Sequence, residues 1–85
     1  SVKDVLISSV SLYPSPVAQG GLINITAKDI VINSASVFDV RGAKVIEKKF
    51  AGNQQIQLSV ATLQSGFYFV RLNNDANKTF KFIVK

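Results

Sequence analysis

The chain has 85 residues, a length that suits one domain, and its 47% hydrophobic and 18% charged residues exclude a chain that is disordered by composition. The absence of cysteine and histidine excludes disulfide cross-links, the usual nucleophile–base pairs and most transition-metal sites. No apolar run approaches the roughly 20 residues of a membrane-spanning helix, and no export signal is recognisable at the start, so an exported parent is expected to carry that signal elsewhere in a longer precursor.

The net charge of +5 is unevenly distributed along the chain. Residues 1–42 have no net charge, whereas residues 43–85 carry seven cations against two acids. Such a basic half can attract nucleic acid, an anionic lipid surface or an acidic protein. It is also typical of a solvated sheet face whose lysines prevent edge-to-edge aggregation, so charge alone leaves these interpretations open.

The N-terminal segment shows no clear strand. Residues 1–9 contain apolar residues without a clean period and are interpreted as a linker or a loose first strand, which places the domain at residues 10–85. Pro14 and Pro16 fix φ and lack an N–H, so the segment around them is expected to be extended and turning, with no long ladder.

Regular alternation begins after a glycine turn. Residues 22–26 alternate between apolar and polar side chains, which predicts a strand with Ile23 and Ile25 on one face. Residues 35–39 are rich in apolar and small residues and predict the next strand.

A hairpin is predicted where this strand ends. Asp39 begins a turn in which Gly42 supplies a positive φ, the signature of a type I turn followed by a G1 bulge. This geometry places Val37 opposite Val45 on the returning strand, residues 44–50. Asp39 is therefore interpreted as a structural turn residue whose carboxylate accepts backbone N–H bonds.

The second half continues the strand pattern. Residues 55–60 alternate without a break, which buries Ile56, Leu58 and Val60. Gly66 opens a strand over residues 67–72, and a turn cluster precedes the last strand, residues 79–85. Turns recur every ~8–12 residues, so the predicted fold is all-β, an immunoglobulin-like antiparallel β-sandwich of about seven strands.

The last hairpin has an inner and an outer face. Because successive side chains of a strand alternate between its two faces, the inner face is expected to carry Tyr68, Val70, Leu72, Phe80, Phe82 and Val84. The outer face is expected to carry the apolar residues Phe67, Phe69 and Ile83. The polar residues Arg71, Thr79, Lys81 and Lys85 are expected to point toward solvent. A turn centred on Asp75 places Phe69 across from Lys81 and Phe67 across from Ile83. An apolar strip flanked by cations is typical of a partner surface, but a loop or the N-terminal tail could also cover it.

The sequence offers little chemistry. The five acids are scattered without a close pair, so no catalytic residue, cofactor-binding residue or metal ligand is assigned, and the domain is expected not to be an enzyme. The one loop rich in oxygen ligands for calcium is residues 73–77, for which a plain hairpin turn is the preferred interpretation.

Four segments resemble a known family when they are taken together. They are YPSPV at residues 13–17, VFDVRG at 37–42, LQSGFYFV at 63–70 and KFIVK at 81–85. In this order and spacing they resemble the C-terminal sorting domain of the type IX (Por) secretion system, type A. The chain departs from the family pattern at Ser15, where asparagine is usual, and at Phe38, where tyrosine is usual. The motif residues expected to hold the fold are Tyr13, Pro14, Pro16, Asp39, Gly42, Gly66 and Tyr68.

The resemblance implies a function. It implies a signal that targets its parent through the outer membrane, from the periplasm to the cell surface or the extracellular space. It also implies removal by a sortase-like peptidase, with attachment of the N-terminal passenger to the cell surface. We expect the outer-membrane translocon to recognise the last hairpin, through the following residues: Phe67, Phe69, Arg71, Lys81, Phe82, Ile83, Val84 and Lys85.

Two other functions are compatible with a small basic β-domain. One is an immunoglobulin-like adhesion or carbohydrate-binding module of a larger surface protein. The other is a nucleic-acid-binding barrel, which is disfavoured because the turn spacing indicates a sandwich and the first half has no net charge. A homodimer of the isolated domain through its edge strands is possible, and no nucleic-acid partner is expected.

Overall fold

The computed structural model describes residues 10–85, and the segment interpreted as a linker or loose strand, residues 1–9, lies outside the described residues. The described part of the chain forms seven strands and one short 3-10 helix: β1 (Val10–Tyr13), β2 (Leu22–Ala27), β3 (Ile32–Phe38), β4 (Lys44–Asn53), β5 (Gln55–Ser59), β6 (Gly66–Leu72), η1 (Ala76–Lys78) and β7 (Thr79–Val84). In this part of the chain no helix is long and apolar enough to cross a bilayer.

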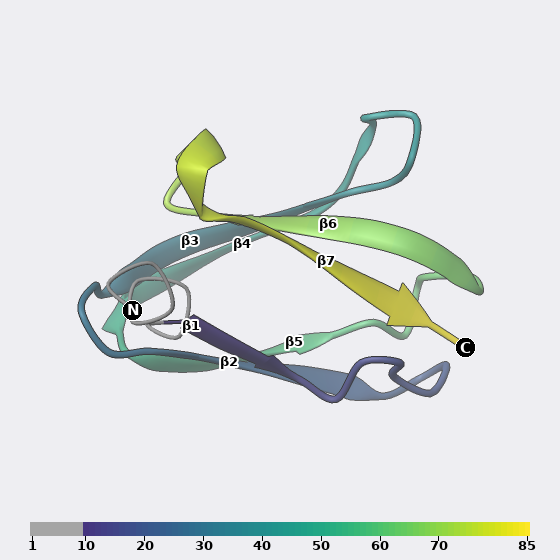
Figure 1. The fold of residues 1–85 in the computed structure, drawn as a ribbon, viewed down its shortest axis with the longest axis horizontal. Helices are drawn as coiled ribbons and strands as arrows, with labels where there is room; N and C mark the ends of the chain where they lie inside the picture. The colour runs from purple at the N-terminus through teal and green to yellow at the C-terminus, as the bar shows by residue number, and fades with distance from the viewer. Residues whose placement is uncertain (1–9) are drawn as a thin grey trace, which may run out of the picture.

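The strands form two antiparallel sheets, one of three strands in the order β1-β2-β5 and one of four in the order β4-β3-β6-β7. Figure 1 shows the two sheets as stacked layers, with β6 and β7 in one and β1, β2 and β5 in the other. The predicted antiparallel sandwich of seven strands is confirmed, and it is compatible with an immunoglobulin-like fold.

The core lies between the layers and is built from the alternating residues. Each sheet contributes the inward half of its strands, as expected for side chains that alternate between faces. The predicted inward residues are buried, and they are Ile23, Ile25, Ile56, Leu58, Val60, Tyr68, Val70, Leu72, Phe82 and Val84. Phe80 is only partly buried, at the margin of this core.

The hairpin between β3 and β4 has the predicted turn but a different register. The N–H of Gly42 donates to the carbonyl of Asp39 at 3.0 Å, and the φ of Gly42 is +87°. The prediction that Val37 faces Val45 is wrong, because a bulge follows and Val37 pairs with Ile46 instead. The extra residue reverses the alternation of β4, so Ile46 packs against the core and Val45 is left 41% exposed.

The segment that follows β1 is bonded to the end of the chain. The N–H of Val17 donates to the carbonyl of Ile83 at 2.8 Å, and the N–H of Lys85 donates to the carbonyl of Val17 at 2.9 Å. The hydroxyl of Ser15 accepts from the N–H of Ile83 at 3.2 Å. These bonds form a parallel bridge between Val17 and Val84, and Figure 1 shows the segment after β1 approaching the end of β7.

The sequence prediction missed both the strand β1 and this bridge. β1 does end at Tyr13, before Pro14, so the expectation of a short ladder agrees with the structure. The bridge satisfies backbone groups of β7 that would otherwise form an open sheet edge. The N-terminal motif and the C-terminal strand are therefore parts of one structural unit.

Candidate functional site

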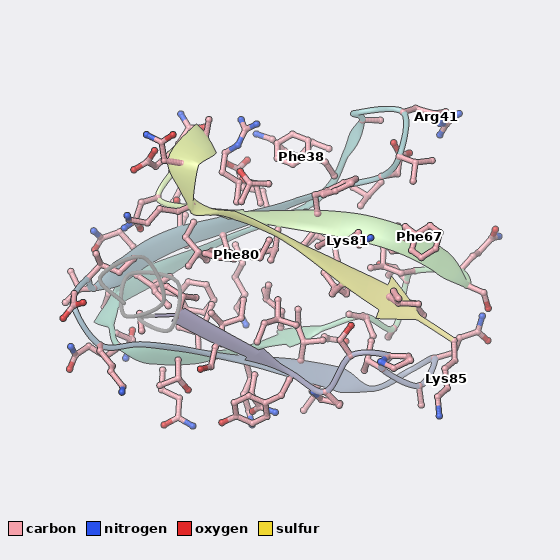
Figure 2. All side chains as sticks on the ribbon, in the orientation of Figure 1. Phe38, Arg41, Phe67, Phe80, Lys81 and Lys85 are labelled. Atoms are coloured by element: carbon pink, nitrogen blue, oxygen red, sulfur yellow. The ribbon has the colours of Figure 1, made fainter. Side chains whose placement is uncertain are left out.

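The outer face of the four-stranded sheet is the strongest candidate surface. The strand registers place Phe38 between Lys44 on β4 and Phe69 on β6, and they place Phe69 beside Lys81 on β7. One row across all four strands therefore has two aromatic rings at its centre and a lysine at each end. Figure 2 shows Phe38 on the side of the sheet that faces away from the other layer.

Two cations on this face lie over aromatic rings. The Lys81 ammonium is 5.3 Å from the centre of the Phe67 ring, and the Arg71 guanidinium is 4.8 Å from the centre of the Phe38 ring. Both distances lie within the range of a cation–π attraction. The rings are thus held beside positive charge, an arrangement that suits a partner with both apolar and acidic groups.

The exposure of the strip differs along its length. Phe67 is 51% exposed, whereas Phe69 and Ile83 are half-buried. The predicted pairs of Phe67 with Ile83 and of Phe69 with Lys81 are both present. Phe67 is therefore the most accessible aromatic ring of the last hairpin.

The predicted recognition residues separate into two groups. Lys81 and Lys85 are exposed, and Arg71 is half-buried because it lies against Phe38 and does not extend into solvent. Phe82 and Val84 are 0% and 2% exposed, respectively, so a partner cannot contact their side chains on the folded domain.

Sequence analysis missed Phe38 and Lys44 as members of the surface. The alternation around Val37 turns Phe38 outward, and that signal was present in the sequence. What the alternation does not reveal is which strands are neighbours, and the surface exists only because β3 lies between β4 and β6.

Some of the motif residues make identifiable structural contacts. The Tyr68 hydroxyl donates to the carbonyl of Gln64 at 2.8 Å, and its ring stacks on Phe82 with 5.8 Å between centres. Gly66 has a φ of +151°, and Tyr13 accepts a hydrogen bond from the side chain of Asn24 through its carbonyl. Pro14 and Pro16 lie at the surface between β1 and Val17.

The asparagine-rich turn before η1 is tied to β3 through its side chains. The side-chain oxygen of Asn73 accepts from the N–H of Asn33 at 2.7 Å, and its amide group donates to the carbonyl of Val31 at 2.9 Å. The Asp75 carboxylate accepts from the N–H of Asn77 at 3.0 Å. Within residues 10–85 no group of three or more acidic side chains gathers into a metal cluster.

Asp39 is the anchor of the β3–β4 hairpin. One carboxylate oxygen accepts from the N–H groups of Arg41 and Ala43 at 2.9 and 3.0 Å, and the other pairs with the Arg41 guanidinium at 3.0 Å. The side-chain bond from Arg41, followed by the bond from the Ala43 N–H, holds the pKa of this carboxyl below its ordinary value of 3.8.

This pKa makes the hairpin pH-dependent. Because the folded pKa of Asp39 is lowered, its carboxylate stabilises the fold fully above pH 3.8 and loses this contribution as the pH falls through the lower folded value. We expect Asp39→Ala to destabilise the chain at pH 7 and the difference from the wild type to narrow below pH 3.8. Urea unfolding at pH 7 and pH 3 gives the free energy of unfolding of the wild type and of the variant. If the two chains differed in this free energy by the same amount at both pH values, the role assigned to the Asp39 carboxylate would be contradicted.

Comparison with known families gives one match. A family model described as "Secretion system C-terminal sorting domain" matches residues 11–85. No curated protein matches the chain.

Proposed function

We propose that this chain, which belongs to the family of secretion system C-terminal sorting domains, presents the outer face of its four-stranded sheet to the outer-membrane translocon of the type IX system. As a sorting signal it directs its parent toward the cell surface or the extracellular space. The observation that carries the proposal is the row of Lys44, Phe38, Phe69 and Lys81 beside the exposed Phe67.

The energetics favour this face for recognition. Aromatic side chains bury a large area at little conformational cost, and adjacent cations add attraction for an acidic partner. A sheet face also presents its side chains in fixed positions, because β3 and β6, which carry Phe38 and Phe69, each have a hydrogen-bonded strand on both sides. A soluble domain that exposes aromatic rings among cations on a rigid face has the features of a protein-binding surface.

Processing of the precursor is a further part of the proposal. A sortase-like peptidase would cut within or just before residues 1–10, and the passenger would remain attached to the cell surface after passage through the periplasm. The family resemblance supports this step. Since β1 begins at Val10, a cut there would leave both sheets of the domain whole.

The test uses a secreted reporter fused ahead of residue 1 in a host that has this export system. We expect Phe67→Ser to lower surface delivery by about tenfold or more, since truncating a central interface aromatic commonly costs about 2 kcal/mol. The urea midpoint should stay unchanged because Phe67 is 51% exposed.

The matched control is Leu22→Ser on the other sheet. Leu22 is 47% exposed, so this variant removes an equally accessible apolar side chain from a surface outside the proposal. It should leave delivery intact. Equal delivery of the two variants would remove the outer face of the four-stranded sheet from the recognition mechanism.

A further inference from the structure

A hollow lies at the base of the β3–β4 hairpin, on the outer face of the four-stranded sheet. Figure 1 shows this hairpin extending beyond the sheet on the side away from β1, β2 and β5. The hollow has a volume of about 440 Å³, and its walls are formed by Phe38, Asp39, Val40, Gly42, Phe69, Arg71 and Thr79. It therefore combines two aromatic rings, a guanidinium, the carboxylate of Asp39 and the apolar tip of the hairpin.

Among residues 10–85, Arg71 forms no ion pair with an acidic side chain in this hollow. Its Nε is buried and has no hydrogen-bond acceptor among residues 10–85. The Asp39 carboxylate, which also lines the hollow, already accepts hydrogen bonds from Arg41 and Ala43. Glu47 lies in the same cross-strand row but is separated from Arg71 by Ser36, and it pairs with Lys44 at 3.6 Å.

A buried N–H without an acceptor costs free energy, and the cost is larger for a charged group. A carboxylate removes that cost once the half-buried guanidinium turns from the Phe38 ring toward the mouth of the hollow, because its planar fork then binds the two carboxylate oxygens side by side. The Thr79 hydroxyl donates to the carbonyl of Ala76 at 2.8 Å, so it offers no competing donor. The specificity of the hollow for an anion therefore rests on Arg71.

From these contacts we propose that the hollow binds an acidic side chain of the protein partner, with an apolar neighbour of that side chain packed on Phe69 and Val40. Val40 is 67% exposed and stands at the rim, where such a neighbour would cover it. The net charge of +5 adds long-range attraction for an acidic segment. This inference rests on the proposed function only for the identity of the partner as secretion machinery.

An anionic membrane offers the same charge with a different shape. Lipid phosphates lie in a plane, whereas the free Nε of Arg71 is buried below the surface, beside Phe38. A single side chain fits a recessed donor better than a flat array of headgroups does. The hollow thus favours a protein carboxylate, and vesicles serve as the competing probe.

The experiment is a titration of the ¹⁵N-labelled 85-residue chain, followed by NMR, with the peptide acetyl-Leu-Glu-Leu-amide and its glutamine counterpart. We expect a saturable shift of the Arg71 Nε–H and of the Phe38 and Phe69 amides with the glutamate peptide. The glutamine peptide should bind roughly tenfold more weakly, as expected for the loss of a charged hydrogen-bonded pair.

Two variants test the geometry. Arg71→Lys keeps the charge but removes the planar fork, so the glutamate peptide should bind several-fold more weakly. The binding to this variant is measured from the chemical shifts of the Phe38 and Phe69 amides. Lys49→Gln removes a cation from β4 outside the hollow and should leave binding unchanged.

Three results would overturn the proposal. They are equal binding of the two peptides, equal weakening by Arg71→Lys and Lys49→Gln, and a shift of the Arg71 Nε–H with phosphatidylglycerol vesicles but not with the glutamate peptide. Reporter export separates this proposal from the previous one. If export depends on Phe67 but the glutamate peptide does not bind, the recognition face is supported and the carboxylate site is contradicted.

Discussion

Replacing Phe82 by alanine is expected to lower the free energy of unfolding by about 3–5 kcal/mol, the usual cost of removing a fully buried aromatic ring. Phe82 is 0% exposed and stacks on Tyr68, so its removal leaves a cavity where the two sheets meet. Small domains have a total free energy of unfolding of about 5–15 kcal/mol, so this single change would remove a large part of the stability. Urea unfolding at neutral pH measures the loss.

The neighbouring residue provides the control. Lys81 is exposed on the same strand, and Lys81→Ala should change the stability by less than about 1 kcal/mol, since it removes one exposed cation–π contact with Phe67. If the two variants unfolded at the same urea concentration, β7 would not pack in the core as described.

This result bears on how the sorting signal is tested. Removal of residues 81–85 deletes the surface residue Lys81 together with the buried Phe82 and Val84. It also removes the carbonyl of Ile83, which accepts from Val17. A loss of export after such a truncation would reflect unfolding as well as lost recognition. Substitution of Phe67 separates the two effects.

The fold class and the inward faces could be predicted from the sequence because both depend on local patterns. Alternation in residues 22–26 and 55–60 determines which side chains face the core, whatever the neighbouring strand is. The turn from Asp39 to Gly42 is equally local, since the Asp39 carboxylate and the positive φ of Gly42 act within five residues.

The pairing across the sheets could not be predicted in the same way. The bulge at Val45 is decided by the better burial of Ile46, which depends on the opposite sheet. The surface row needs β3 to lie between β4 and β6, and a period-two pattern contains no information on strand order. The apolar strip was therefore found on the last hairpin, but its continuation through Phe38 was not.

The bridge between Val17 and the end of β7 could not be predicted from the sequence, and it is expected to have a large effect on stability. Val17 is 2% exposed, and its backbone is bonded to both Ile83 and Lys85. We expect Val17→Asp to lower the free energy of unfolding by about 4 kcal/mol or more, because an acidic group loses its hydration when it is buried in an apolar core.

Ala18→Asp is the matched control, because it introduces the same charge at the next residue, which is exposed. Its effect should stay within about 0.5 kcal/mol. Hydrogen exchange of the Lys85 amide tests the mechanism separately, since that N–H is protected by the Val17 carbonyl. A Val17→Asp chain that stays folded while its Lys85 amide exchanges freely would mean that the bridge is peripheral. A chain that unfolds would mean that the N-terminal proline motif contributes to sorting through folding, because β7 needs it in order to keep its place in the sheet.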